Sequence, residues 1–300
     1  MKTIAALFVL LATTTVALAH PGHESLTTVP APAVAAEVSI TVEGAKRVIR
    51  ANGIPDHATG RFPGRGNPNV IAAQRYVLVV PMSPQRAATT TPLGMGPFGV
   101  AVNGVVFDPG ANEWWHEDRS TGWQYEALGG GRNLGIDTEH AHVQPNGAYH
   151  YHGMPTALLT RLTGGKPQMV LVGWAADGFP LYGPWIPTDA NDVTSALKRA
   201  LPSYRLKAGA RPDGPGGAHD GTFGKDWAYV AGSGDLDGCN GRMGKTPEFP
   251  AGTYYYVLTD DYPFVPRLWR GTPDSSFSRR GPPPRGGPDG GKGKQQKRAP

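Results

Sequence analysis

Four histidines fall within thirteen residues near the middle of the chain, as two His-x-His pairs. The first pair is His140 and His142, the second is His150 and His152, and Gln144-Pro-Asn-Gly147 lies between them. Imidazole is a common ligand of transition metals, and three or four converging ring nitrogens form a metal site at bond lengths of about 2 Å. The sequence therefore predicts a site for a divalent transition metal, with zinc, copper and iron all compatible.

The four rings converge only if the segment is a β-hairpin of one particular register. Residues two apart in a strand face the same side of the sheet. Pro145 and Asn146 suit the middle of a type I turn, and Gly147 suits the left-handed position of a three-residue loop. That loop sets the two histidine pairs opposite each other on one face, whereas a four-residue loop would turn one pair to the other face. The predicted cross-strand pairs are His142 with His150 and His140 with His152.

Metal-bound histidines usually donate their second ring nitrogen to an oxygen acceptor. Asp137, Glu139 and Asp177 are the candidates for this role. The alternative to a metal is a polar network, in which the histidines hydrogen-bond one another, carboxylates and the backbone, or a site for a phosphate-like anion.

The rest of the sequence indicates short strands and many turns. The chain has 42 glycines and 30 prolines, and only 18% of its residues are charged, which favours turns over long surface helices. We expect a single mainly β, loop-rich domain, like a sandwich or barrel, with few short helices. Strands are expected over residues 37–48, 76–80, 100–107, 169–174 and 253–258, and one short helix over residues 192–201.

We expect the folded domain at residues 37–270, and the two ends of the chain lie outside it. Lys2, an apolar run and Ala17-Leu-Ala19 form the pattern of a signal peptide, residues 1–19, with cleavage expected after Ala19. We therefore expect a secreted or extracytoplasmic protein. No later segment is long enough to span a membrane. Residues 20–36 are expected to form a mobile linker, and residues 271–300 a disordered basic tail rich in glycine and proline.

Charge argues against nucleic acid as the specific partner of the domain. The formal net charge is +5, and residues 271–300 hold seven basic and two acidic residues, so 7 − 2 accounts for all of it. The remaining chain is balanced, and the tail alone is suited to an anionic surface. The sequence leaves the oligomeric state open.

Two further features qualify as sites. Cys239 is the single cysteine, so an internal disulfide is excluded. This residue could instead be a small buried apolar side chain, a metal ligand or a reactive thiol. The segment of residues 112–118, with Trp123 and Tyr125, has the aromatic composition of a glycan-binding surface or of a packed core. Serine-hydrolase, nucleotide-binding and dithiol motifs are absent from the sequence.

The histidine segment His140-Ala-His-Val-Gln-Pro-Asn-Gly-Ala-Tyr-His-Tyr-His-Gly153 resembles the signature of the YHYH family, named for the stretch from Tyr149 to His152. The resemblance covers roughly residues 38–275. It implies an exported context, and it supplies neither a reaction nor a catalytic residue. Seven further segments resemble family segments and occur in the same order as in the family: Asn52-Gly-Ile-Pro55, Ala101-Val-Asn-Gly104, Phe107-Asp-Pro-Gly110, Gly173-Trp-Ala-Ala-Asp-Gly-Phe-Pro-Leu-Tyr-Gly183, Gly234-Asp-Leu-Asp237, Cys239-Asn-Gly-Arg242 and Thr253-Tyr-Tyr-Tyr-Val-Leu-Thr-Asp260.

Three functions are compatible with these features. The first is an exported protein that binds a transition metal through the histidine hairpin. The second is a non-enzymatic extracellular module that binds glycan or a partner and uses the histidines as a structural network. The third is a metal-dependent hydrolase or oxidase, in which Asp177 or Glu139 acts as general base towards a bound water.

Overall fold

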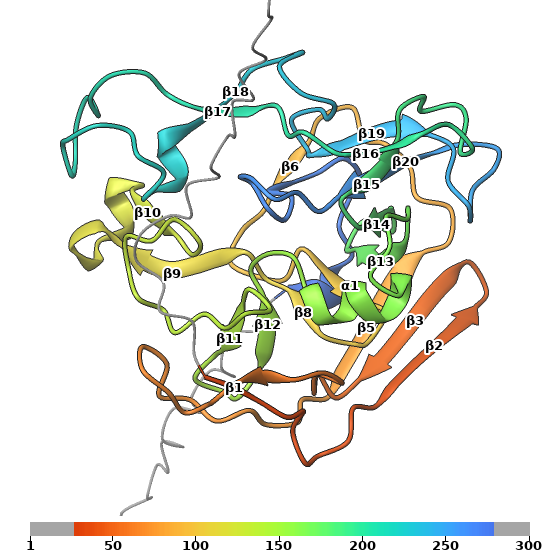
Figure 1. Ribbon diagram of the computed structural model, residues 1–300, viewed down its shortest axis with the longest axis horizontal. Coiled ribbons are helices and arrows are strands. Elements are labelled where there is room, and N and C mark those ends of the chain that lie inside the picture. The colour runs from red at the N-terminus through yellow and green to blue at the C-terminus, as the bar shows by residue number, and fades with distance from the viewer. Residues whose placement is uncertain (1–26, 279–300) are drawn as a thin grey trace, which may run out of the picture.

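The structure is a computed structural model that describes residues 27–278. A curled sheet of eight strands is its largest element, and smaller sheets surround it (Figure 1). The expected mainly β, loop-rich fold is confirmed. Helix α1 (Thr156–Thr163) is the only α-helix among the described residues, which otherwise have only four short 3₁₀ helices, at Trp115–Glu117, Arg119–Thr121, Gly224–Asp226 and Ser275–Phe277.

The eight-stranded sheet has the order β11-β12-β8-β7-β13-β14-β20-β19. Neighbouring strands are antiparallel except for β12 with β8 and β14 with β20. The hairpin of β11 and β12 therefore forms one edge of the sheet and joins the rest through β8. The strands are β7 (Gly99–Ala101), β8 (Val106–Phe107), β11 (Ala141–Val143), β12 (Tyr149–Tyr151), β13 (Leu171–Ala175), β14 (Pro180–Tyr182), β19 (Gly241–Gly244) and β20 (Thr253–Val257).

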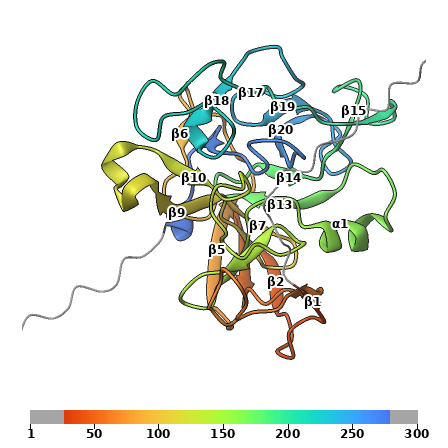
Figure 2. The same ribbon diagram turned by 60° about the vertical axis from the view of Figure 1, so that its left-hand side comes forward.

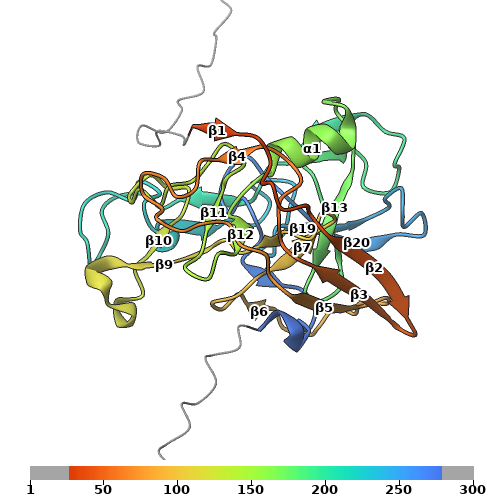
Figure 3. The same ribbon diagram turned by 90° about the horizontal axis from the view of Figure 1, so that it is seen from below.

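A three-stranded sheet of β2 (Val38–Glu43), β3 (Lys46–Ala51) and β5 (Tyr76–Pro81) lies beside this sheet. In Figure 2, β2 and β5 lie in the lower half of the molecule, and β17 to β20 in the upper half. Figure 3 shows α1 and β1 on one side of the molecule and β6 on the other. The two-stranded pairs are β1 (Thr28–Val29) with β4 (Thr59–Gly60), β6 (Thr91–Pro92) with β21 (Leu268–Trp269), β9 (Gly110–Trp114) with β10 (Gln124–Glu126), β15 (Trp185–Pro187) with β16 (Leu197–Arg199), and β17 (Tyr204–Leu206) with β18 (Trp227–Tyr229).

Glycine packs the middle of the large sheet tightly. A Cβ added to Gly173 of β13 would overlap the carbonyl oxygen of Val100 in β7, and one added to Gly99 would overlap that of Trp174. Around these strands the main core holds fully buried aromatic rings such as Phe98, and apolar side chains from both large sheets. The core thus holds the sheet, and with it the edge hairpin, in a fixed position.

The expected strands at residues 76–80, 169–174 and 253–258 are confirmed to within two residues at each end, as β5, β13 and β20. The expectation of one strand at residues 37–48 and one at residues 100–107 is wrong, because each range contains parts of two strands joined by a turn. The first is the hairpin of β2 and β3, with Gly44 at φ 62° in the turn, and the second is β7 and β8, with Gly104 at φ 83°. Each glycine occupies the left-handed region, which favours residues without a Cβ, and so reverses the chain.

The helix expected over residues 192–201 is wrong. The Asp192 side chain instead accepts hydrogen bonds from the backbone N–H and hydroxyl of Thr194, which closes a turn. Residues 197–199 then form β16, and Leu197 packs against a second core cluster that includes Ile186 of β15. Tertiary burial therefore outweighs the local capping pattern.

Residues on both sides of the expected domain contact it. Thr28 and Val29 pair with β4, although they fall in the segment expected to be a linker. At the other end, Phe277 is buried in the main core, and the Ser276 hydroxyl accepts a hydrogen bond from the Val79 N–H. Both contacts involve residues outside the expected domain of residues 37–270. The expected signal peptide and the tail beyond residue 278 lie outside the described residues.

Within residues 27–278, no helix combines the length and the apolar character that crossing a membrane requires.

Candidate metal centre

The histidine hairpin has the register that the sequence predicts. His142 of β11 is directly opposite His150 of β12. Gln144 and Ala148 close the loop, since the Gln144 N–H donates to the Ala148 carbonyl oxygen over 2.9 Å. Gly147 at φ 86° provides the left-handed position. The three-residue loop is therefore correct, and it turns the side chains of His142, His150 and His152 to the same face.

His140 does not join them, so the expectation that all four rings share one face is wrong. Its φ is 52°, which interrupts the strand alternation before β11 begins. The cause is a turn held by Asp137, whose carboxylate accepts hydrogen bonds from the N–H groups of Glu139 and Ala141. The His140 Nδ1 instead lies 2.8 Å from the carbonyl oxygen of Met154, and the ring lines a separate cavity.

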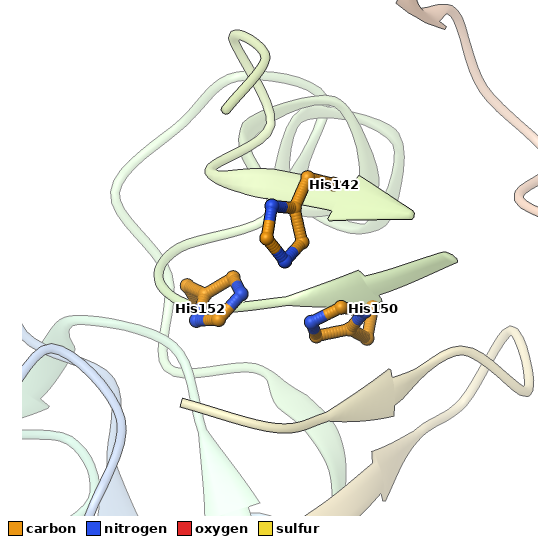
Figure 4. Close-up of side chains that lie close together, drawn as sticks. All are labelled: His142, His150 and His152. Carbon is orange, nitrogen blue, oxygen red and sulfur yellow. The ribbon is translucent and has the colours of Figure 1, made fainter. Parts of the chain in front are cut away.

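The other three rings form a compact cluster. Each residue contributes one ring nitrogen to a set of three, and these three nitrogens all lie within 4.8 Å of one another. The ring centroids of His142 and His152 are 4.6 Å apart, and those of His150 and His152 are also 4.6 Å apart. Figure 4 shows the His142 ring from one strand pointing between the two rings of the other. Three potential ligands thus converge from a single hairpin.

Backbone carbonyl groups orient two of the rings. The His142 Nδ1 is 2.8 Å from the carbonyl oxygen of Leu134, and the His150 Nδ1 is 3.1 Å from that of Ala148. Because a carbonyl oxygen only accepts, each Nδ1 must carry the proton, and the lone pair of each neutral ring is then on Nε2. This arrangement is the one in which metal-binding histidines are usually held.

His152 is the most unusual residue of the cluster. It is 1% exposed, and neither of its ring nitrogens makes a hydrogen bond to any residue in the part of the chain that is described. Burial lowers the pKa of His152 well below its ordinary value, and the His142 and His150 rings lower it further. The Pro109 carbonyl acts in the opposite direction on this pKa, without forming a well-aligned hydrogen bond.

A buried polar group without a partner costs about 1–3 kcal/mol. The neutral state that burial enforces on His152 is also the state in which imidazole binds a metal. Burial lowers the pKa of His142 in the same sense, against the smaller opposing effects of the Leu134 carbonyl and of Glu113. Burial therefore favours the uncharged form of His142 and of His152.

The three carboxylates predicted to support the histidines have other partners. Asp137 accepts hydrogen bonds from the Tyr149 hydroxyl and the Gly60 N–H, in addition to those of its turn. Glu139 accepts hydrogen bonds from residues in the first turn of α1. Asp177 accepts them from the Tyr256 hydroxyl and the Gly271 N–H. These hydrogen bonds to the three carboxylates come from groups other than the histidines, whereas backbone carbonyls contact the His142 and His150 rings.

The tyrosines that alternate with the histidines lie on the core side of the hairpin. Tyr149 and Tyr151 are fully buried. The Tyr151 hydroxyl lies 2.6 Å from the Nε2 of His57 and accepts a hydrogen bond from Asn103. His57 has no motif of its own and is 94 positions from Tyr151 in the chain, so nothing in the sequence pointed to it.

The other predicted candidates are less suited to chemistry. Cys239 is buried, and burial together with Asp237 raises its pKa to about 12, so its thiol is a poor nucleophile. In the aromatic segment, Trp123 is 3% exposed and its Nε1 donates to Asp213. Trp123 therefore belongs to the packed interior and is not part of an open glycan-binding surface.

The fold and the site together define a mainly β protein with a three-histidine cluster on the edge hairpin of its central sheet. The family model described as YHYH protein matches residues 77–271, which is more than half of the 300 residues. The chain therefore belongs to the YHYH family, as its sequence resemblance indicates. Neither the search of curated proteins nor that of solved structures gave a match.

Proposed function

We propose that this YHYH-family protein binds one divalent transition metal ion through His142, His150 and His152. The observation that carries the proposal is the buried His152 ring, which lacks a hydrogen-bond partner in the described chain and faces two further imidazoles. A metal ion would give its lone pair a partner and offset its desolvation.

The donor set suits zinc, copper and iron. Neutral imidazole nitrogens favour these ions, whereas calcium and magnesium prefer oxygen ligands. Bonds of about 2 Å to a tetrahedral ion bring ligand nitrogens to about 3.3 Å from one another. The nitrogens of the cluster lie within 4.8 Å, so small side-chain rotations would close the site.

Three protein ligands would leave a coordination position for water or another small ligand, as at catalytic zinc sites. The metal-dependent hydrolase or oxidase is therefore the second candidate, and the partial exposure of His142 favours it. A bound ion would supply Lewis acidity or redox chemistry there. The residues first considered as general bases, Asp177 and Glu139, have the structural partners described above and do not support this candidate.

Export is part of the same proposal. It is supported by the signal-peptide pattern of residues 1–19. N-terminal sequencing of protein recovered from the medium or the periplasm should give a chain that starts at His20. Full-length protein retained in the cytoplasm would contradict export without bearing on the metal site.

Elemental analysis of untagged protein tests metal binding. We expect about one zinc, copper or iron ion per chain after purification or reconstitution, and a melting temperature that falls when a chelator removes the ion. His152→Leu should lose the ion. His140→Asn is the matched control, because asparagine tolerates a positive φ and His140 lies outside the cluster. A wild-type metal content near zero after reconstitution would refute the proposal.

A further inference from the structure

A cavity of about 440 Å³ lies beside the hairpin, and the three clustered histidines are not among its lining residues. Its volume falls in the range of about 300–1,000 Å³ that is typical of small-molecule sites. Leu128, Ile136, Met154 and Phe264 give it an apolar lining. A ligand here would therefore gain most of its affinity from the burial of apolar surface.

His140 gives this cavity one well-defined hydrogen-bond acceptor. Its Nδ1 donates to the Met154 carbonyl oxygen over 2.8 Å, so the neutral ring has its lone pair on Nε2. No residue among 27–278 donates a hydrogen bond to that Nε2. The left-handed backbone that takes His140 out of the metal cluster also places its ring against this cavity.

The charged residues at the cavity are already paired. The Arg199 Nε donates to the Asp260 carboxylate over 2.6 Å, and its Nη2 contacts the other carboxylate oxygen. The same guanidinium lies 5.3 Å from the centroid of the Trp185 ring. Asp137, which also lines the cavity, is held by the four hydrogen bonds described above. An anionic ligand would meet two carboxylates, and a cationic ligand would meet Arg199.

The geometry points to a binding site for a neutral aromatic alcohol or phenol. Its ring packs among the four apolar side chains, and its hydroxyl group donates a hydrogen bond to the Nε2 of His140. This inference concerns residues outside the proposed metal centre and does not depend on it.

Titration calorimetry with 2-naphthol, naphthalene and 2-naphthoate tests the site on the full mature protein. We expect saturable binding of 2-naphthol, about five- to tenfold tighter than that of naphthalene, which lacks the hydroxyl group. The anionic 2-naphthoate should bind more weakly than either. His140→Asn should remove the preference for 2-naphthol and leave the affinity for naphthalene unchanged.

A second variant tests the location. Thr138 is exposed and lines the cavity, so Thr138→Trp should fill it and weaken both neutral ligands at least tenfold. Circular dichroism and the metal content of both variants should match those of the wild type, because neither residue belongs to the three-histidine cluster. Equal affinity of wild type and Thr138→Trp, no saturation by 2-naphthol at millimolar concentration, or tighter binding of 2-naphthoate would each overturn the assignment. None of these results would affect the metal proposal.

Discussion

His142 and His150 lie directly opposite each other on the β11–β12 hairpin, with ring centroids 4.7 Å apart. A cross-strand pair of this kind is fixed by the register of the hairpin and not by side-chain flexibility. His152 is two residues beyond His150 on the same face and completes the cluster. One short loop, residues 145–147, therefore controls the geometry of the candidate site.

The buried His152 ring should destabilise the metal-free protein. Replacing a buried polar group that lacks a partner by an apolar group is close to neutral or stabilising. We expect His152→Leu to have an unchanged or higher melting temperature in chelator, and to lose the rise in melting temperature that zinc gives the wild type. A variant that melts several degrees lower in chelator would instead indicate that His152 has a stabilising partner in the metal-free protein.

Glu139 should act as a cap for α1. Its carboxylate accepts hydrogen bonds from the Thr156 hydroxyl, over 2.8 Å, and from the Ala157 N–H, over 2.6 Å. Loss of a helix cap typically costs about 1 kcal/mol, so urea denaturation should show that loss for Glu139→Ala. Glu139→Gln keeps an acceptor oxygen and should lose clearly less. Loss of the metal from Glu139→Gln, with stability intact, would indicate a role in the metal centre instead.

Asp177 should make stability depend on pH. Burial raises its pKa above the ordinary value of 3.8, against the lowering effect of hydrogen bonds from Tyr256 and Gly271. The folded protein therefore holds this proton more tightly than the unfolded chain. The resulting stabilisation is complete below the ordinary pKa and is lost as the pH rises through the raised pKa, by about 1.4 kcal/mol per unit of pKa difference.

Asp177→Asn lacks this titration and is the matched variant. Urea denaturation from about pH 4 to about pH 7 should show the free energy of unfolding of the wild type falling relative to that of Asp177→Asn. A difference that is constant with pH, or that changes in favour of the wild type, would contradict the raised pKa.

Gly173 should tolerate no side chain. A Cβ at this position would overlap the backbone carbonyl of Val100 in the neighbouring strand, and backbone in a central sheet cannot move away easily. Gly173→Ala should destabilise the protein by about 2–4 kcal/mol in urea denaturation. Gly94→Ala is the control, because a Cβ there meets no atom within 4 Å and should change stability little. Similar values for the two variants would show that β7 and β13 are less closely packed.

The hairpin register was predictable because it depends on local chemistry. Proline, asparagine and glycine at residues 145–147 specify a loop with one left-handed position, and strand alternation then assigns the faces. The displacement of His140 also has a local signal in the sequence, three residues earlier. An aspartate such as Asp137 commonly closes a turn by accepting hydrogen bonds from N–H groups two to four residues later.

Other parts of the site have no signal in the sequence. The carbonyl oxygens of Leu134 and Ala148 orient the rings, and every residue has such an oxygen, so residue type cannot identify them. The same is true of β16, where pairing with β15 overrides a local capping pattern. Long-range burial decides both cases, and a single sequence does not show which distant segments meet.

Anomalous diffraction from a crystal of the untagged protein soaked with zinc would show directly whether the three histidines bind the ion. We predict a peak at the zinc edge within bonding distance, about 2 Å, of one ring nitrogen each of His142, His150 and His152. We predict no corresponding peak in His152→Leu crystals. A peak at His140 but not at the cluster, or a cluster without a peak in crystals that bind zinc elsewhere, would show that the three histidines do not form a zinc site.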